Sequence, residues 1–305
     1  MTGYPHVYFA GAWRPRGQAV ASMDSLALRY ALSVFEGVRL YRGIDGARPR
    51  PFLLAEHLDR MRTSLSAMRL PDPGVDQVPA LVRELVDRNG IDQDAYARIT
   101  ATPLNAGGLG DDAETALTVT ATPMGRKRWL AEGIGMSLAV SATQRAPSAA
   151  FPAAVKNISN YAGPRLALLA AKDAGHDGCV LSNRWGRLCE APTAALFLVR
   201  DGTLLTPALT EDVLPSITRA WLLAEAARTG LPARETTLTA EDAYRCDEAF
   251  LCGTGIELAP VRAFDGRPCG HWPDDRVTRL LAVRYFTAAR GGAGPRSALL
   301  AETAP

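Results

Sequence analysis

Lysine is rare in this sequence, and one lysine stands where its amine could do chemistry. Only three of the 34 basic residues are lysines, at positions 127, 156 and 172. Arginine serves most surface roles equally well, whereas only lysine carries an amine that can form an imine and be tuned by burial. Lys156 follows the small apolar run Ala153-Ala154-Val155. That setting suits either a lysine that reaches out to solvent or one whose amine faces a pocket.

Two side chains further along the sequence could assist such an amine. Tyr161, five residues after Lys156, offers a phenol that can donate to an ionised 3-oxygen on a cofactor ring. Glu190 lies between an apolar strand end and a loop that contains Pro192. A glutamate in such a loop is commonly a solvated carboxylate. Held against a pyridine nitrogen, it would instead keep that nitrogen protonated, so that the ring could withdraw electrons from a carbanion.

Two backbone features could bind a phosphate group. The segment 214–219 is typical of a helix start, where backbone N–H groups and a hydroxyl converge on one point. Ser216 lies in that segment, and its simpler role is the N-cap of the helix. Gly253-Thr254-Gly255 follows a predicted strand and offers further N–H groups and a second hydroxyl. A dinucleotide site is excluded there, because Pro260 follows too soon for the helix that such a site requires.

The elements that position these residues can be predicted from hydrophobic periodicity. In the first half we expect strands at 5–10, 35–41, 96–102 and 115–122, and helices at 53–70 and 77–89. Apolar residues of the first helix repeat at spacings of four and three and predict a core face: Leu54, Leu58, Met61, Leu65 and Met68. The opposite flank carries His57, Arg60 and Ser64, so we expect Arg60 to reach out from a rigid element.

The second half follows a segment without periodicity. Residues 123–135 gather glycine, arginine and lysine, and we place the domain junction there. Beyond it we expect strands near 136–141, 178–182, 195–200, 203–205 and 248–252, and helices near 163–174, 217–230 and 276–289. The pattern predicts a two-domain α/β fold, α+β by some schemes. The predicted parts are a small N-terminal domain at 1–122, an interdomain loop at 123–135 and a larger C-terminal domain at 136–305.

Composition argues against several classes of function. The net charge of +2 comes from basic residues scattered among acids, which leaves no basic stripe for nucleic acid. The sequence shows no signal-peptide pattern and no apolar run near the ~18 residues of a membrane helix, so we expect a cytoplasmic protein. Five cysteines without C-x-x-C spacing suit a reducing compartment, and four widely separated histidines predict no metal site.

Taken in order, these segments resemble the class IV aminotransferases, which are the fold type IV pyridoxal-phosphate enzymes, and within them the branched-chain amino acid aminotransferases. The resemblance covers most of the chain, and its strength lies in the ordered set rather than in any single motif. The segments that carry it are Ser33-Val34-Phe35-Glu36-Gly37-Val38-Arg39-Leu40-Tyr41, Glu56-His57-Leu58-Asp59-Arg60, Tyr96-Ala97-Arg98, Lys156 with Tyr161, Glu190, Leu204-Leu205-Thr206-Pro207, Ile217-Thr218-Arg219 and Gly253-Thr254-Gly255.

The resemblance implies a pseudo-barrel C-terminal domain and a role for each candidate residue. Lys156 is implied to bind pyridoxal 5'-phosphate as a Schiff base and to shuttle a proton between the substrate α-carbon and the cofactor. Tyr161 is implied to donate to the ring 3-oxygen, and Glu190 to pair with the pyridine nitrogen. The implied phosphate-binding residues are Arg60, Ile217, Thr218 and Thr254.

The resemblance also implies a substrate pocket and a reaction. The implied pocket residues are Phe35, Tyr96, Arg98 and Gly255, with Tyr30 reaching in from a neighbouring subunit, so a homodimer is the expected minimum. In the implied reaction a branched-chain or related apolar amino acid leaves as a 2-oxo acid. A second 2-oxo acid such as 2-oxoglutarate then takes the amine. The Tyr-x-Arg spacing makes Arg98 the candidate acceptor of the glutamate side-chain carboxylate.

The sequence departs from the family pattern near the substrate. The family has an asparagine shortly before a phenylalanine after the glutamate, whereas this chain has Ala195 before Phe197, and Pro192 removes a backbone N–H. Ser216 replaces a glycine. Pro123-Met124-Gly125-Arg126-Lys127 replaces aromatic pocket residues. These changes point to an altered substrate, such as a specialised amino acid or amine.

Other functions on the same fold are the alternatives. Relatives act as D-amino acid aminotransferases, amine transaminases or aminodeoxychorismate lyases, but Phe35-Glu36-Gly37-x-Arg39 favours the branched-chain group. A non-catalytic protein on this scaffold is a further alternative. Retention of Lys156 in so lysine-poor a chain argues against it.

Overall fold

The computed structural model, which describes residues 3–291, divides into two compact units. The first unit contains the residues up to Gly125 together with Val155–Ser159. The second contains Arg126–Ala154 and the residues from Asn160 onward. Each unit has one β-sheet with helices, which confirms the predicted α/β class. The domain limits at 122 and 136 stay a prediction, and the segment Val155–Ser159 groups with the first unit although it lies within the predicted C-terminal domain.

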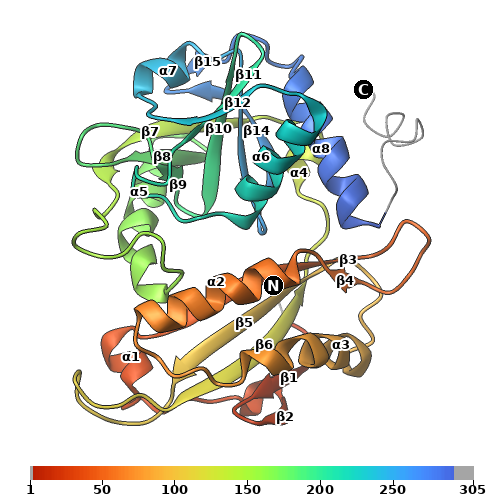
Figure 1. The fold of residues 1–305 in the computed structure, drawn as a ribbon, viewed down its shortest axis with the longest axis vertical. Helices are drawn as coiled ribbons and strands as arrows, with labels where there is room; N and C mark the ends of the chain where they lie inside the picture. The colour runs from red at the N-terminus through yellow and green to blue at the C-terminus, as the bar shows by residue number, and fades with distance from the viewer. Residues whose placement is uncertain (1–2, 292–305) are drawn as a thin grey trace. The chain divides into compact units, whose positions relative to one another are not determined.

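The first unit is built on a six-stranded antiparallel sheet with the order β2-β1-β6-β5-β3-β4. Its strands are β1 (His6–Phe9), β2 (Ala12–Pro15), β3 (Val34–Tyr41), β4 (Arg50–Pro51), β5 (Ala95–Pro103) and β6 (Thr115–Pro123). Its helices are α1 (Leu26–Tyr30), α2 (Leu54–Ala67) and α3 (Val78–Arg88), with the 3-10 turns η1 (Arg16–Gln18) and η2 (Val75–Gln77). Helices α2 and α3 lie over one face of this sheet, against β3 and β6 respectively (Figure 1).

The hydrophobic core of the first unit lies between these helices and the sheet. The predicted core face of α2 is confirmed, because Leu58, Met61 and Leu65 are buried and Leu54 and Met68 pack against the same cluster. Burial alternates along β5, so its buried alanines face the core and the intervening side chains lie on the other face of the sheet. That other face carries candidate site residues.

The second flank of α2, from which we expected Arg60 to reach out, faces the interior of the unit. The side chains of His57 and Ser64 on this flank are 2% and 0% exposed. The reason is that both contact polar groups inside the unit: His57 bonds to Glu36 on β3, and Ser64 accepts a hydrogen bond from the backbone of Lys156. Helix α2 is therefore buried on two sides, one apolar and one polar.

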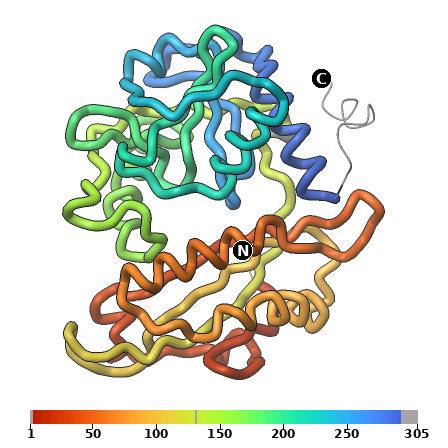
Figure 2. Tube along the Cα trace, viewed as in Figure 1, coloured from red at the N-terminus to blue at the C-terminus, as the bar shows by residue number. Residues whose placement is uncertain are grey.

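The second unit is built on a nine-stranded mixed sheet whose main path is β12-β11-β10-β13-β14-β7-β8. Its strands are β7 (Met136–Gln144), β8 (Gly178–Ser182), β9 (Glu190–Ala191), β10 (Ala194–Arg200), β11 (Thr203–Pro207), β12 (Ala233–Thr236), β13 (Glu248–Gly253), β14 (Glu257–Phe264) and β15 (Arg267–Pro268). Strand β9 pairs with β10, and β15 with β14. The pairs β11–β12, β14–β7 and β7–β8 are parallel. The path of the chain through these strands can be followed in Figure 2.

Helices of the second unit are α4 (Arg128–Ala131), α5 (Ala162–Asp173), α6 (Ile217–Thr229), α7 (Ala240–Tyr244) and α8 (Arg276–Ala289). The 3-10 turn η3 (Ile158–Tyr161) leads into α5. Ser216 is the N-cap of α6, because its side chain accepts a hydrogen bond from the N–H of Arg219. The simpler of the two predicted roles for Ser216 is thus confirmed.

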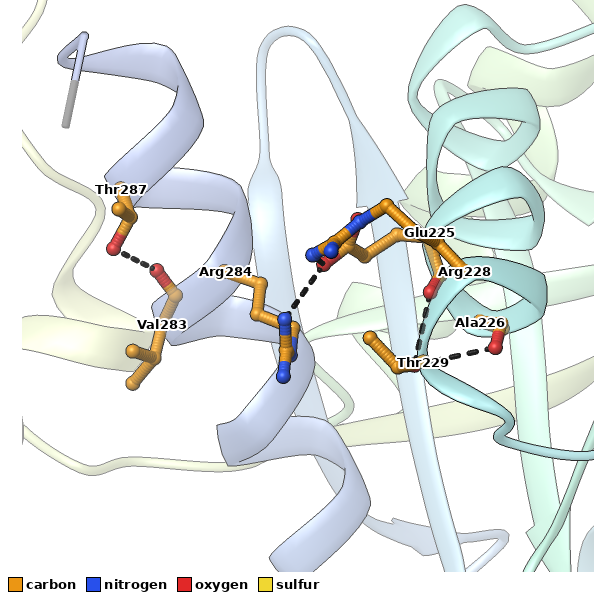
Figure 3. Close-up of polar contacts among 7 residues, drawn as sticks. All are labelled: Glu225, Ala226, Arg228, Thr229, Val283, Arg284 and Thr287. Carbon is orange, nitrogen blue, oxygen red and sulfur yellow. Dashed lines mark hydrogen bonds and ion pairs between the residues drawn. The ribbon is translucent and has the colours of Figure 1, made fainter. Parts of the chain in front are cut away.

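Helix α6 is tied to α8 through one buried carboxylate. Glu225 accepts two hydrogen bonds from Arg228, one turn further along α6, and one of 3.0 Å from Arg284 on α8 (Figure 3). The hydrogen bond from Arg228 is the main cause that lowers the pKa of Glu225, and it favours the charged form of the carboxylate. The contact holds the body of the helix whose start was predicted to bind phosphate.

Several elements of the structure were not predicted. Strands β2 and β12 and helices α1 and α7 have five residues or fewer, which is too short for periodicity to show. Strand β14 was not predicted because it contains Pro260. A proline can occupy a strand at a position where its missing N–H is not needed. Within residues 3–291, none of the helices combines the length and apolar character needed to cross a membrane.

Candidate functional site

The candidate residues fall into two groups, one in each unit. The first unit contains Tyr30, Phe35, Arg60, Tyr96, Arg98 and Lys156, and the second contains Tyr161, Glu190, Ile217, Thr218, Thr254 and Gly255. Among the candidates, Phe35, Tyr96, Arg98 and Glu190 lie in strands, Arg60 lies within α2, and Thr254 and Gly255 lie between β13 and β14.

Lys156 is fixed by its backbone to strand β3 and helix α2. The N–H of Phe35 donates to the Lys156 carbonyl oxygen at 3.1 Å, and Val34 forms an antiparallel bridge with Asn157. The N–H of Lys156 donates to the Ser64 hydroxyl at 3.1 Å. The side chain is half-buried, and its Nζ lies 4.7 Å from the centroid of the Phe35 ring. The amine therefore lies over an aromatic ring, at a backbone position held from two sides.

The same ring contacts a second cation. The guanidinium carbon of Arg98 lies 3.8 Å from the centroid of Phe35, a stacking distance. Strand register explains the contact, because β3 and β5 pair with Gly37 opposite Arg98. Directly opposite residues share a face of the sheet, and so do residues two apart in a strand. Phe35, Arg98 and Tyr96 therefore lie on one face, together with the amine of Lys156.

Gly37 permits this arrangement and was not singled out from the sequence. A Cβ atom at this position would lie 1.7 Å from the phenol oxygen of Tyr96, so no other residue fits without moving the tyrosine. The available signal was a glycine inside an apolar strand, which marks a close approach of another group. Gly37 thus leaves room for the Tyr96 phenol.

Arg60 is held by a buried carboxylate that sequence reasoning also missed. Glu36 is fully buried and accepts hydrogen bonds of 2.7 Å from Nε and Nη2 of Arg60 and 2.7 Å from Nδ1 of His57. Burial alone would raise the pKa of Glu36, but the charge and hydrogen bonds of Arg60, aided by His57, lower it to about 2. Arg60 is thus oriented as a fixed cation, with its side chain 12% exposed.

Tyr30 is the last residue of α1 and is half-buried. The next residue, Ala31, has a left-handed backbone and accepts a hydrogen bond of 2.7 Å from the Ser159 hydroxyl. This contact ties the end of α1 to the segment that carries Lys156. The structure describes a single copy of the chain, so the predicted role of Tyr30 in a neighbouring subunit stays a prediction.

In the second unit, Glu190 is not the solvated carboxylate that its loop setting allowed. It lies in β9, is 7% exposed, and forms an ion pair of 2.9 Å with Nη2 of Arg145. Its other oxygen accepts a hydrogen bond of 3.2 Å from the N–H of Leu214. No sequence pattern pointed to Arg145, because the two residues are distant in sequence and meet only through the fold.

The remaining candidates of the second unit lie at turns and helix starts. Ile217 and Thr218 are the first two residues of α6, where backbone N–H groups have no acceptor within the helix. Thr254 and Gly255 form the tight turn between β13 and β14, in which Gly253 pairs with Glu257. Tyr161 ends η3 and is half-buried. A helix start and a hairpin turn both offer N–H groups to an anion.

Comparisons with known proteins decide the family. Residues 33–264, which are most of the chain, match the family described as Amino-transferase class IV. The chain belongs to this family. The branched-chain-amino-acid aminotransferase of Salmonella typhimurium is 31% identical over 288 residues, which cover 92% of each protein. This class IV aminotransferase is thus an enzyme, as the sequence predicted.

Solved structures of branched-chain aminotransferases have the same fold as this aminotransferase. The crystal structure of the branched-chain aminotransferase from Thermoproteus uzoniensis with norvaline has a TM-score of 0.89 and 28% identity, and 99% of each chain is covered. The T.th. branched-chain amino acid aminotransferase complexed with N-(5'-phosphopyridoxyl)-L-glutamate has a TM-score of 0.88 and 30% identity, with 95% of each chain covered. Both confirm the predicted fold type.

Neither cysteines nor metal ligands add a second centre to this aminotransferase in the part of the chain that the structure describes. All five cysteines are buried, and none of them forms a disulfide in the structure. Burial raises the pKa of the Cys179 thiol to about 11, so a reactive thiolate is disfavoured there. Within residues 3–291, no three His, Cys, Asp or Glu side chains are arranged so that they could hold a metal ion.

The Glu36 network predicts a pH-dependent loss of stability in Glu36→Gln. Replacing the carboxylate leaves Arg60 as a buried cation without its counter-ion, which costs about 3 kcal/mol of unfolding free energy at pH 7. Because the pKa of Glu36 is lowered in the folded state, its contribution is complete above its ordinary value of 4.5 and declines as pH falls towards 2. Urea unfolding at pH 7, 4.5 and 3.5 measures this. The exposed Glu56→Gln on the same helix is the control, and an equal loss in both variants would contradict the prediction.

Proposed function

We propose that this class IV aminotransferase uses pyridoxal 5'-phosphate to transfer an amino group between a branched-chain or related apolar amino acid and a 2-oxo acid such as 2-oxoglutarate. The observation that carries the proposal is the Lys156 amine held over Phe35, with Arg98 stacked on the same ring. It is supported by the relatives, one solved with norvaline and another with N-(5'-phosphopyridoxyl)-L-glutamate.

Each unit contains groups whose chemistry suits this cofactor. A phosphate dianion is bound by guanidinium groups and by the N–H groups of helix starts; Arg60 would supply the first, and Ile217 and Thr218 would supply the second. A protonated ring nitrogen needs a fixed anion, and Glu190 is a buried carboxylate with two donors. Tyr161 would donate to the ring oxygen. Thr254 would add a hydroxyl to the phosphate site.

When bound, the cofactor supplies an electron sink for a carbanion at the substrate α-carbon. Lys156 would hold the cofactor covalently, and its Nζ would remove and return the α-proton as general base and acid. The ring of Phe35 limits where that nitrogen can move, because it packs against the amine from one side. Glu190 would keep the ring nitrogen charged throughout the reaction.

The face of the β3–β5 sheet would supply the substrate pocket. Phe35 would contact an aliphatic side chain, and Tyr96 would contribute a phenol for which Gly37 leaves room. Arg98 would bind the side-chain carboxylate of glutamate, so that one pocket accepts both a charged and an apolar substrate. Gly255 would let the substrate approach the backbone of the β13–β14 turn closely.

Visible absorption tests the proposed function directly. Purified wild-type protein reconstituted with pyridoxal phosphate is expected to absorb in the visible, and L-leucine followed by 2-oxoglutarate should remove and restore the band. Lys156→Ala should lose the covalent band, whereas Lys172→Ala, an exposed lysine at the end of α5, should keep it. A wild-type protein that stays colourless with excess cofactor would refute the proposal.

Arg98→Ala tests the acceptor role of Arg98. Loss of a charge-assisted hydrogen bond, about 1.5–3 kcal/mol, should lower kcat/KM for glutamate by about 10- to 100-fold, while the value for leucine changes little. Steady-state kinetics with both donors measures the ratio. The control is Arg50→Ala, an exposed arginine on the edge strand β4. Equal losses for glutamate and leucine would show that Arg98 does not discriminate between side chains.

We also propose that the working unit is a homodimer in which Tyr30 serves the partner's site. Around α1 the first unit exposes large apolar side chains, namely Val20, Met23, Leu28 and Leu109. The loop of Leu109 lies beside α1, because Leu26 bonds to Asn105 and Arg29 to Gly107. A second copy would cover this surface.

Charge placed on this apolar surface should split the dimer. Leu28→Glu is expected to shift the mass measured by light scattering from dimer to monomer at micromolar concentration, because an interface carboxylate would lose its water. The exposed Leu280→Glu on α8 of the second unit is the control. A wild-type mass equal to one chain would contradict the homodimer.

A cytoplasmic location is part of the same proposal. Five buried cysteines without a disulfide among them suit a reducing compartment.

A further inference from the structure

Arg145 connects three separate segments of the second unit. It follows the end of β7, and its N–H donates to the carbonyl of Ser182 at the end of β8 at 2.8 Å. Its Nε donates to the carbonyl of Asp212 at 3.2 Å, and its Nη2 pairs with Glu190 at 2.9 Å. With only 7% of its surface exposed, Arg145 is a buried clamp rather than a surface cation.

The two side-chain contacts of this clamp lead to two groups that are proposed to bind different parts of the cofactor. Glu190 is the proposed partner of the ring nitrogen. Asp212 lies five residues before Ile217, the start of α6 and the proposed phosphate site. Glu190 reinforces the link by accepting a hydrogen bond from Leu214 in the same segment. The carboxylate and the helix start are therefore held to each other by three short polar contacts.

The segment around Asp212, which Arg145 contacts, has a constrained backbone. Asp212 has a left-handed backbone with φ of 59°, and its Oδ1 accepts a hydrogen bond of 2.8 Å from the N–H of Ser148. A non-glycine residue in that conformation persists only where its surroundings hold it. The Arg145 guanidinium supplies one such contact, to the carbonyl of the same residue.

Charged side chains gather near this clamp. Around the buried thiol of Cys189 lie the carboxylates of Glu190, Asp212 and Glu211 and the guanidinium of Arg145. Burial raises the pKa of that thiol well above its usual range, and the carboxylates add to the effect. Glu211 is paired with Arg187.

We propose that Arg145 is a positioning residue for the cofactor: it keeps Glu190 charged and fixes it at a set distance from the start of α6. This rests on the proposed function. Arg145 acts through Glu190 and is not placed on the cofactor itself. A buried carboxylate that loses its cation takes up a proton more readily, and it could then no longer hold a ring nitrogen in its charged form.

A double-mutant cycle separates this role from a merely structural one. The variants are Arg145→Gln, Glu190→Gln and the double variant, with Arg145→Lys as a charge-preserving form that keeps the test open if Arg145→Gln does not fold. The readouts are the dissociation constant of pyridoxal phosphate from the apoprotein and the pH dependence of the visible band, alongside thermal unfolding of each apoprotein. Arg200→Gln is the matched control, because Arg200 also pairs with a carboxylate and a backbone carbonyl, both of Asp242.

If Arg145 acts through Glu190, each single variant should weaken cofactor binding by about 10-fold and shift the pH profile, and the double variant should resemble Glu190→Gln alone. Arg145→Lys should keep part of the binding, because one ammonium replaces the charge but cannot reach both Glu190 and the Asp212 carbonyl. Arg200→Gln should change neither readout. Effects that multiply in the double variant, or an unshifted pH profile in Arg145→Gln, would overturn the proposal. A wild-type protein that binds no cofactor would instead refute the proposed function, and this inference with it.

Discussion

The arrangement of the first unit depends on the backbone pairing between Lys156 and strand β3. The hydrogen bond from Phe35 to the Lys156 carbonyl, the bridge from Val34 to Asn157 and the bond to Ser64 fix a lysine that is distant in sequence from all three partners. Each such bond contributes only about 1 kcal/mol to stability. Their main effect is to fix the position and orientation of the Lys156 backbone. They fix the backbone of Lys156, and the Phe35 ring contacts the amine at the other end of the side chain.

Arginine–carboxylate pairs do the positioning in both units. Arg60 with Glu36 and Arg145 with Glu190 are each buried, and each carboxylate has a second donor, His57 in one case and the Leu214 N–H in the other. A planar guanidinium can bind two acceptors in fixed directions, which the single ammonium of a lysine cannot do. In this chain, arginine thus serves orientation, and the amine of Lys156 is the group suited to covalent chemistry.

Sequence patterns predicted the elements whose signal is local. The core face of α2, the length of α3 and the Ser216 cap each depend on residues within one helix, so spacing and residue type sufficed. Glu36, Gly37 and Arg145 escaped prediction because their partners lie on other strands and helices. In the sequence, Glu36 stands only as one residue of a motif. Its burial against α2 depends on the packing of β3 against that helix, which the sequence does not reveal.

The contacts of Glu190 also give a structural meaning to the alanine at position 195. Strands β9 and β10 pair with Ala195 directly opposite Glu190, so the two side chains share a face of the sheet. The family pattern has an amide at this point, which could donate to the carboxylate, whereas a methyl group cannot. Arg145 and the Leu214 N–H are donors to Glu190 in the structure, and both come from outside this strand pair. Contacts from other segments of the unit, rather than an amide at position 195, thus hold this carboxylate.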